Sequence, residues 1–316
     1  MHHQSISRIH GYAKGASLAG ILLFLSTCAG DTVMVEQGRT TAPPPSKWCT
    51  IGNTRVHYLD IDRADSDRDL LIVHGYLGST VSFLDLIDTL SRDFRVVMPD
   101  LPAFGASEVP DCCCTMDCYL DFLARFAQAA GLDRYYLVGT SMGANIATCY
   151  AAEHPEQVQG LIFLSPFGLH DQAGRMAKIR RWDAFLPLAS SLVTRRGVER
   201  RLRRLILNDE SITPELVDSY WQPFTSPGGR RATVKITRTI VGRRSMDEVL
   251  PRIEQPVLIL VGSEDKLISP EDRERFRVLL AREQLEIIEE SGHFLYLDSP
   301  DVVSKKIVTF TRGGMN

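Results

Sequence analysis

The chain has 316 residues, of which 44% are hydrophobic and 24% are charged, as in an ordinary globular protein. This length is enough for one large α/β domain or two small ones. The formal net charge of −3 argues against a nucleic-acid-binding protein, since such proteins usually carry a basic excess.

The N-terminus has the pattern of a targeting segment. Arg8 and Lys14 supply positive charge ahead of an apolar run at residues 16–27. That run is shorter than the roughly 20 apolar residues that a membrane-spanning helix needs. We therefore expect residues 1–27 to be a signal peptide that is not part of the fold.

A cysteine follows the apolar run directly. Leu25-Ser26-Thr27-Cys28 resembles a bacterial lipobox, although Thr27 stands where Gly, Ala or Ser is usual. The resemblance implies a lipid on Cys28 and a lipoprotein of the cell envelope, anchored to a membrane and facing the periplasm or the exterior. Ordinary secretion and an uncleaved anchor are the alternatives. Residues 28–47 include three consecutive prolines and are expected to form an extended linker.

Short apolar runs and amphipathic stretches alternate along the rest of the chain. Each apolar run predicts a buried strand, and each stretch with helical spacing predicts a helix. The strands are expected at residues 48–51, 55–61, 70–73, 94–98, 135–138, 160–164, 257–261 and 285–288, and the helices at 81–90, 119–130, 144–152, 270–280 and 300–311. The first two strands are expected to be antiparallel. The later alternation predicts an α/β protein with a mostly parallel sheet and helices on both faces.

The alternation stops between residues 167 and 246. This segment is helical in pattern, basic, and interrupted by prolines. An insertion between two strands of one sheet is most simply a lid over the active face. We therefore expect a core made of residues 48–166 and 247–316, with residues 167–246 as a helical cap.

The central motif of the chain is Gly139-Thr140-Ser141-Met142-Gly143, which lies between a predicted strand and a predicted helix. A G-x-S-x-G sequence in this context is typical of a nucleophile elbow. The serine must sit on a turn so sharp that a side chain two residues before or after it would collide with the neighbouring strand or helix. Ser141 is therefore the candidate nucleophile.

A serine nucleophile needs a general base, and the base needs an acid that orients it. After an elbow of this type the partners follow in the order acid, then histidine. Asp265 and His293 both lie directly after predicted strands, so they should reach the same edge of the sheet as Ser141. Glu264 is the rival acid, and the other histidines after the elbow are His154 and His170.

An oxyanion hole is expected from two backbone N–H groups. One is the N–H of Met142, directly after the serine. The other is the N–H of Tyr76, because His74-Gly75-Tyr76 lies in the loop after the third strand and Gly75 lets backbone donors approach a substrate oxygen. A tight turn without a binding role is the alternative for that loop.

These motifs together resemble the α/β-hydrolase fold family over residues 47–311. The motifs are His74-Gly75-Tyr76, Asp100-Leu101-Pro102-Ala103-Phe104-Gly105-Ala106-Ser107, Gly139-Thr140-Ser141-Met142-Gly143, Gly262-Ser263-Glu264-Asp265-Lys266 and Gly292-His293. Within the family, the chain is most similar to bacterial esterase/lipases and monoacylglycerol-lipase-like enzymes. The resemblance implies a capped core, a Ser-Asp-His triad, and ester substrates, with no metal and no cofactor. One departure is Ala103, where the family commonly has Gly.

The other departure is the cysteine run Cys112-Cys113-Cys114 with Cys118. Outside the cytoplasm, Cys112 or Cys114 could form a disulfide with Cys118. A metal site would need a second ligand pair at a matching spacing, and the sequence supplies none. Disulfides or structural thiols are therefore expected here, and metal binding is the weaker alternative.

The leading functional hypothesis is a serine carboxylic-ester hydrolase that acts on a small-molecule ester or a lipid. Phe167 and Phe294 are its candidate substrate-binding residues. A C–C bond hydrolase or a thioesterase on the same triad is the alternative among enzymes. A dehalogenase is not expected, because its nucleophile would be an Asp at the position of Ser141. Outside enzymes, the alternative is a surface-anchored binding module on an inactive scaffold.

Basic residues concentrate in the first half of the cap. Apolar residues are interleaved with them, which on a helix places a cationic face beside an apolar one. This pattern suits an anionic lipid surface, so the cap is a second candidate membrane contact. The alternative is a solvated outer face. The basic residues are Arg175, Lys178, Arg180, Arg181, Arg195, Arg196, Arg200, Arg201, Arg203 and Arg204.

Overall fold

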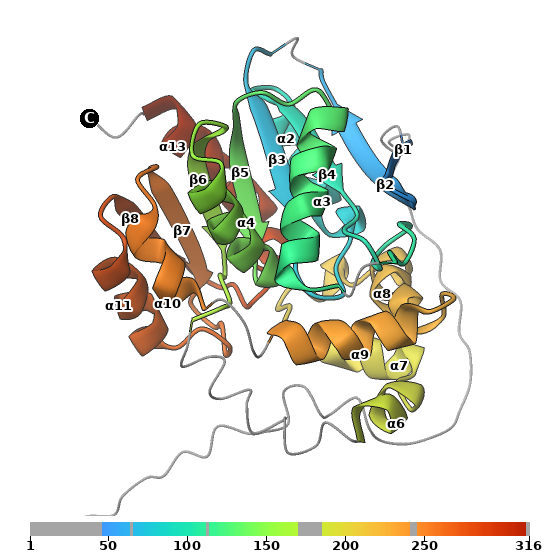
Figure 1. Ribbon diagram of the computed structural model, residues 1–316. Coiled ribbons are helices and arrows are strands. Elements are labelled where there is room, and N and C mark those ends of the chain that lie inside the picture. The colour runs from blue at the N-terminus through green and yellow to red at the C-terminus, as the bar shows by residue number, and fades with distance from the viewer. Residues whose placement is uncertain (1–45, 64–65, 112–113, 170–184, 241–244, 314–316) are drawn as a thin grey trace, which may run out of the picture.

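An eight-stranded sheet runs through the centre of the protein, with helices on both of its faces (Figure 1). The computed structural model describes residues 46–63, 66–111, 114–169, 185–240 and 245–313. The predicted signal peptide, Cys28 and most of the predicted linker lie outside the described residues. No helix among the described residues is long and apolar enough to cross a membrane.

The strands follow the order β1-β2-β4-β3-β5-β6-β7-β8 across the sheet. The first two strands and the β2–β4 pair are antiparallel, and every later pair is parallel. The prediction of a mostly parallel α/β sheet is thereby confirmed. The bounds are β1 Ser46–Ile51, β2 Thr54–Ile61, β3 Asp69–Val73, β4 Arg95–Pro99, β5 Tyr135–Thr140, β6 Val158–Leu164, β7 Val257–Gly262 and β8 Glu283–Ile288.

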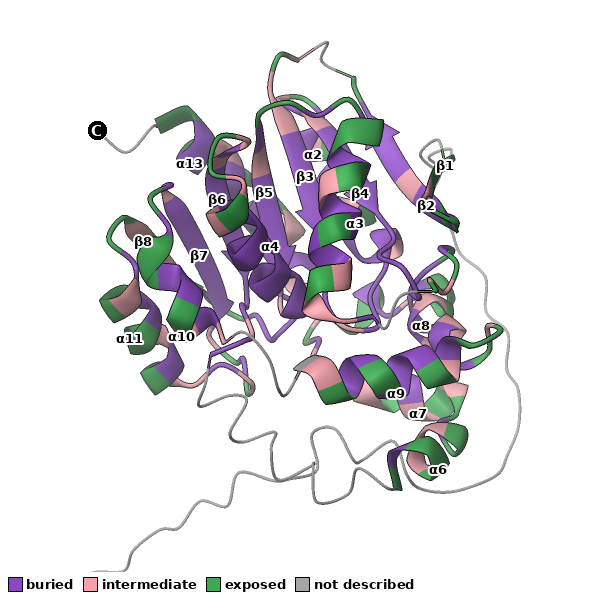
Figure 2. Ribbon diagram, in the orientation of Figure 1, coloured by how far each residue is buried: buried purple, intermediate pink, exposed green. Residues whose placement is uncertain are grey.

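The inner strands are buried over almost all of their length, with one half-buried residue near the start of each of β3, β4, β5 and β6 (Figure 2). All six residues of β7 are buried, which agrees with the unbroken apolar composition of a strand covered on both faces. The core helices are η1 Thr80–Phe83, α2 Leu84–Leu90, α3 Met116–Ala129, α4 Met142–Glu153, α10 Met246–Val249, η5 Leu250–Arg252, α11 Pro270–Leu279, α12 Leu295–Asp298 and α13 Pro300–Gly313. β1 begins two residues inside the predicted linker.

A helical cap between β6 and β7 covers the carboxyl edge of the sheet (Figure 1). Side-chain contacts join it to the core. For example, the Tyr76 hydroxyl lies 2.7 Å from the Thr237 hydroxyl, and Ser82 donates to the Tyr220 hydroxyl at 3.3 Å. The described cap helices are α6 Leu186–Ser191, α7 Arg195–Leu202, η3 Asp209–Ser211, α8 Pro214–Trp221, η4 Gln222–Phe224 and α9 Gly229–Ile240.

The cysteine run borders α3. Cys118 is disulfide-bonded, whereas Cys114 keeps a buried thiol, so the predicted alternative of a Cys114–Cys118 bond is wrong. Cys112 and Cys113 lie outside the described residues. Within the described ranges, no group of three or more His, Cys, Asp or Glu side chains is arranged to hold a metal ion.

The loop after β4 is built around the buried carboxylate of Asp100. That carboxylate accepts hydrogen bonds from the backbone N–H groups of Thr80 and Ala106, at 2.7 and 2.8 Å. Gly105 has φ +53, and a Cβ on it would lie 2.2 Å from Asp100 Cγ. Ala103, the departure from the family pattern, has φ +75, a conformation in which Gly is unstrained.

Two substitutions in this loop should therefore differ in their effect on the free energy of unfolding. Gly105→Ala should lower the free energy of unfolding by about 2–4 kcal/mol, because its methyl group overlaps the Asp100 carboxylate. Ala103→Gly should change it by less than about 1 kcal/mol, since relief of backbone strain offsets the greater entropy of the unfolded glycine. Urea unfolding of both variants measures this. An Ala103→Gly variant as unstable as Gly105→Ala would contradict the conformational argument.

Candidate active site

Ser141 stands on a strained turn between β5 and α4. Its backbone has φ 50 and ψ −118, which few residues other than Gly adopt. A Cβ on Gly139 would lie 2.6 Å from Ala144 Cα in α4, and a Cβ on Gly143 would lie 2.3 Å from the Val73 carbonyl oxygen in β3. Both glycines of the motif are thus required by close packing against a helix and a strand, as the sequence predicted.

The three side chains predicted to form a triad lie in one hydrogen-bonded line. The Oγ of Ser141 is 3.1 Å from Nε2 of His293, and Nδ1 of the same ring is 2.9 Å from Oδ2 of Asp265. Because a carboxylate accepts, the Nδ1–H of a neutral ring donates to Asp265, and Nε2 then accepts from the serine hydroxyl. This arrangement can remove a proton from Ser141.

Asp265 is held in its ionised form. Its burial acts to raise the pKa of the carboxyl, but the imidazole of His293 and the backbone N–H of Leu267 outweigh that effect and hold the pKa below its usual range. The N–H of Leu267 donates to Oδ1 at 2.8 Å, and that of Ile268 does so at 3.3 Å. One carboxylate oxygen is therefore fixed by backbone, which leaves the other for the histidine.

The rival residues take other positions. Glu264 is exposed, whereas its neighbour Asp265 is buried. His154 ends α4 and its ring lies 4.5 Å from that of Tyr150. His170 lies outside the described residues.

A second line of Ser, His and Asp crosses the sheet near β1. Nε2 of His57 lies 3.1 Å from the Oγ of Ser46, and its Nδ1 lies 2.8 Å from Oδ2 of Asp100. Ser46, however, begins an edge strand, and within the described residues it does not stand on a strand-to-helix turn as Ser141 does. Sequence reasoning missed this line because it placed Ser46 in the linker and considered Asp100 only as part of a loop motif.

The predicted oxyanion loop lies against the serine. A Cβ on Gly75 would be only 3.1 Å from Ser141 Cβ, so the backbone of this loop borders the side chain of the candidate nucleophile. His74 braces the loop, since its Nε2 accepts the Leu101 N–H at 2.9 Å and its Nδ1–H donates to the Gly75 carbonyl at 2.8 Å. Burial lowers the pKa of His74 and so keeps its ring neutral.

The other predicted donor is Met142, the first residue of α4. Backbone N–H groups in the first turn of a helix have no partner within the helix, and the helix dipole favours negative charge beside them. The side chain of Tyr76 turns away to the cap residue Thr237, and burial raises the pKa of its hydroxyl to about 12. Tyr76 can therefore offer only its backbone to a reacting oxygen.

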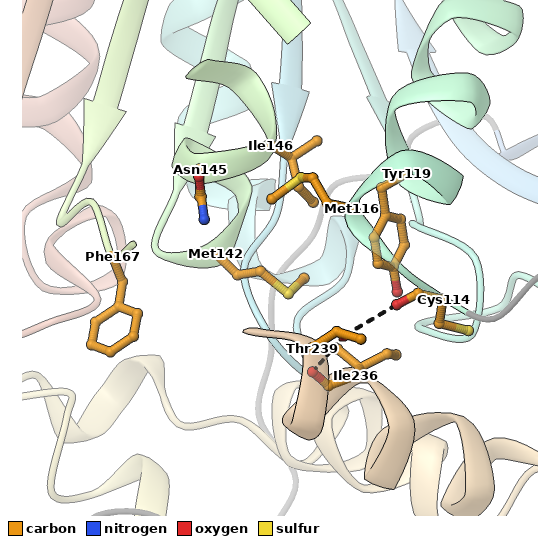
Figure 3. A pocket seen from close by; sticks show the side chains of 9 residues that line it. All are labelled: Cys114, Met116, Tyr119, Met142, Asn145, Ile146, Phe167, Ile236 and Thr239. Carbon is orange, nitrogen blue, oxygen red and sulfur yellow. Dashed lines mark hydrogen bonds between the residues drawn. The ribbon is translucent and has the colours of Figure 1, made fainter. Parts of the chain in front are cut away.

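An apolar pocket lies between α3, α4 and the cap helix α9, and Met142, the residue that follows the serine, is in its wall (Figure 3). It is small, with a cavity volume of about 30 Å³. Phe167, predicted to bind substrate, lines the pocket, and its N–H donates to the Ser141 carbonyl at 3.1 Å. The lining residues are Cys114, Met116, Tyr119, Met142, Asn145, Ile146, Phe167, Ile236 and Thr239.

Phe294, the other predicted substrate-binding residue, does not line this pocket. Its ring packs edge-on against His293, with 5.5 Å between ring centroids, and makes similar contacts with Tyr220 and Tyr296. Phe294, itself packed against Tyr220 and Tyr296, thus helps to hold the ring of His293 in place.

The cap also holds the histidine loop, which sequence reasoning missed. The carbonyl of Leu205 accepts the N–H of His293 at 3.0 Å. Asp298 accepts the N–H of Gly292 on Oδ2 at 2.7 Å. Its Oδ1 accepts two further backbone N–H groups from the cap, those of Leu207 at 2.7 Å and Asn208 at 2.8 Å. One carboxylate thus ties the cap segment between α7 and η3 to the loop that carries His293.

Several curated proteins are similar to the chain over most of its length. An uncharacterized hydrolase of Bacillus subtilis is 24% identical over 86% of this chain and 99% of its own length. A 2-hydroxy-6-oxo-6-(2'-aminophenyl)hexa-2,4-dienoic acid hydrolase of Metapseudomonas resinovorans is 23% identical, over 84% and 90%. A haloalkane dehalogenase of Bradyrhizobium diazoefficiens is 26% identical, over 77% and 87%. A monoacylglycerol lipase of Xenopus laevis is 23% identical, over 84% and 81%.

Among solved structures, a bacterial membrane phospholipase A described as a virulence factor superimposes with a TM-score of 0.73. It is 24% identical, and the match covers 85% of this chain and 86% of that one. A likeness at this identity reports the fold. The family model described as alpha/beta hydrolase fold matches residues 70–300, which include all three residues of the Ser141 line. The chain therefore belongs to the alpha/beta hydrolase fold family.

Proposed function

We propose that the protein is a serine hydrolase that cleaves carboxylic esters, with a small-molecule ester or a lipid as its substrate. The observation that carries this proposal is the line from Ser141 through His293 to Asp265, with contacts of 3.1 and 2.9 Å, on a strained elbow at the carboxyl edge of the sheet.

In the proposed reaction, Ser141 Oγ attacks the ester carbonyl carbon while His293 Nε2 takes the hydroxyl proton. The ionised Asp265 stabilises the imidazolium that forms. The N–H groups of Met142 and Tyr76 bind the negative oxygen of the tetrahedral intermediate. His293 then passes its proton to the leaving alcohol, and an acyl-enzyme results. A water molecule, deprotonated by His293, then attacks the acyl-enzyme carbonyl, and the carboxylic acid and free Ser141 are released.

The pocket beside Met142 supports a substrate with an apolar part. Its wall is formed mainly by thioether, aliphatic and aromatic side chains, such as Met116, Ile146 and Ile236. Apolar surfaces of this kind favour an acyl chain over a charged group. The names of two similar proteins, a monoacylglycerol lipase and a phospholipase, point to the same substrate class.

A C–C bond hydrolase or a thioesterase on the same triad is the alternative. One similar protein is named as a hydrolase of a hexadienoic acid, which keeps this alternative open. A dehalogenase is disfavoured, because Ser141 stands where that chemistry would want an aspartate. A p-nitrophenyl ester chain-length series, run beside a thioester and a vinylogous diketone and with fluorophosphonate labelling of the serine, tests the proposal. Absence of both ester turnover and serine labelling would contradict the proposal and favour a binding module without catalytic activity.

The residues of the two Ser-His-Asp lines provide a matched test. Ser141→Ala and His293→Ala should each lower ester turnover by at least about 1,000-fold, because each removes an essential part of the acyl-transfer machinery. Ser46→Ala should keep wild-type turnover, since that serine lies on an edge strand. Steady-state kinetics on p-nitrophenyl butyrate measures all three. Loss of activity in Ser46→Ala alone would move the nucleophile to the second line.

Asp298 is proposed as a positioning residue for His293. Asp298→Ala removes the acceptor of three backbone N–H groups, so kcat should fall by about 10- to 100-fold while KM changes less, because the base is misplaced. Asp298→Asn, which keeps an acceptor oxygen, should recover part of the loss. Asp301→Ala, an exposed acid of α13, is the control. A lower melting temperature with unchanged kcat in Asp298→Ala would reduce the residue to a purely structural role.

We further propose that the protein is a cell-envelope lipoprotein attached through Cys28, on the lipobox-like Leu25-Ser26-Thr27-Cys28. Mass spectrometry of protein purified from membranes should find residue 28 as the N-terminus, with a mass increase for the acyl groups. Cys28→Ser should release the protein from the membrane fraction. An N-terminus elsewhere, or an unmodified Cys28, would contradict the assignment.

A further inference from the structure

The arginines predicted to form a cationic face do not all face the solvent as free charges. Arg195 pairs with Asp218, and Arg203 pairs with Glu199 and Asp209. Arg201 is half-buried, and its burial, with the charge of Arg204, lowers the pKa of its guanidinium to about 10. Arg175, Lys178, Arg180 and Arg181 lie outside the described residues. The basic run alone therefore gives a weaker surface than its sequence indicates.

The structure places a different apolar surface at the tip of the cap. Leu188 lies on α6, and Leu192 follows one turn later at the end of that helix. Their exposed fractions are 60% and 54%. Figure 2 shows α6 at the end of the cap farthest from the sheet, and Leu186 is its one buried residue. Two large aliphatic side chains one helical turn apart and open to water form the kind of surface that binds an apolar phase.

A basic helix lies directly beside α6. The helices α6 and α9 pack against each other, and the guanidinium of Arg230 donates to the Ser190 carbonyl. α9 contains no acidic residue, and its exposed side includes Arg231 and Lys235, one turn apart. The opposite side of α9 is buried against the core and the pocket, so these two charges face outward.

The charge of this region is opposite to that of the whole chain. Residues 185–240 contain ten Arg and Lys against five Asp and Glu, whereas the whole chain has a net charge of −3. Basic residues near an anionic bilayer gain electrostatic attraction that salt screens, while exposed leucines gain from entering the acyl region. A soluble acidic partner would match the charges but would not need the leucines.

We propose that the cap tip, defined as Leu188 and Leu192 of α6 with Arg231 and Lys235 of α9, docks on the surface of an anionic phospholipid bilayer. This surface is separate from the Ser141 site and does not depend on the proposed ester hydrolysis. It would place α9, which forms part of the pocket through Ile236 and Thr239, next to the lipid phase.

The test uses the full chain and sedimentation with vesicles of phosphatidylcholine alone or of phosphatidylcholine with phosphatidylglycerol. Arg231→Glu/Lys235→Glu should weaken binding to the anionic vesicles by about tenfold or more at low salt, and little at high salt. Leu188→Asp/Leu192→Asp should weaken binding at both salt concentrations. Because the N-terminal segment is the same in every variant, its own contribution cancels in the comparison.

Matched controls carry the same chemical changes on the core. Arg252→Glu/Lys305→Glu reverses two exposed charges, and Val278→Asp/Val302→Asp replaces valines that are 67% and 44% exposed. Both controls should bind as the wild type does. Hydrolysis of a soluble p-nitrophenyl ester, measured on all variants, should stay within about twofold, which separates this proposal from that of the catalytic function. Equal losses in the core controls, equal binding to both vesicle types, or unchanged binding in the cap variants would overturn the proposal.

Discussion

The close packing around Ser141 is the constraint on which the rest of the site depends. A residue with φ 50 and ψ −118 costs on the order of 1–3 kcal/mol, and only rigid surroundings can maintain it. Those surroundings are the contacts of Gly139 with α4 and of Gly143 with β3, where no side chain fits. The strain turns the serine hydroxyl out of the sheet and toward the histidine, and it starts α4 with its N–H groups beside the reacting atom.

The parallel topology and the cap together complete the site. The strands β3, β5 and β7 end at one edge, so Gly75, Ser141 and Asp265 meet there although they are far apart in the chain. His293 is held from three sides: by Asp265, by the ring of Phe294, and by the cap carbonyl of Leu205. The cap is therefore not only a cover. Its inner end forms part of the support of the histidine.

The sequence predicted those parts of the site that local patterns carry. The elbow, the acid and the histidine each follow an apolar run, and the cap was visible because the alternation of strands and helices stops. The supports at Leu205 and Asp298 left no such pattern, because a backbone carbonyl has no signature and the contacts of Asp298 span about 90 residues. The pairing of Arg195 was hidden for a related reason, because its acidic partner Asp218 lies 23 residues away in the sequence.

The second line of Ser46, His57 and Asp100 shows why hydrogen-bond geometry alone does not define a nucleophile. Its distances, 3.1 and 2.8 Å, are as short as those around Ser141. Asp100, like Asp265, accepts two backbone N–H groups, and burial, which acts to raise its pKa, is outweighed by its histidine and those donors, so the carboxylates do not distinguish the two lines. In the part of the chain that the structure describes, Ser46 starts a strand, has no positive φ and is not followed by a helix. Three side chains in a hydrogen-bonded line can thus serve only to fix a loop. A serine nucleophile also needs a strained turn and a helix N-terminus, and of the two serines Ser141 has both.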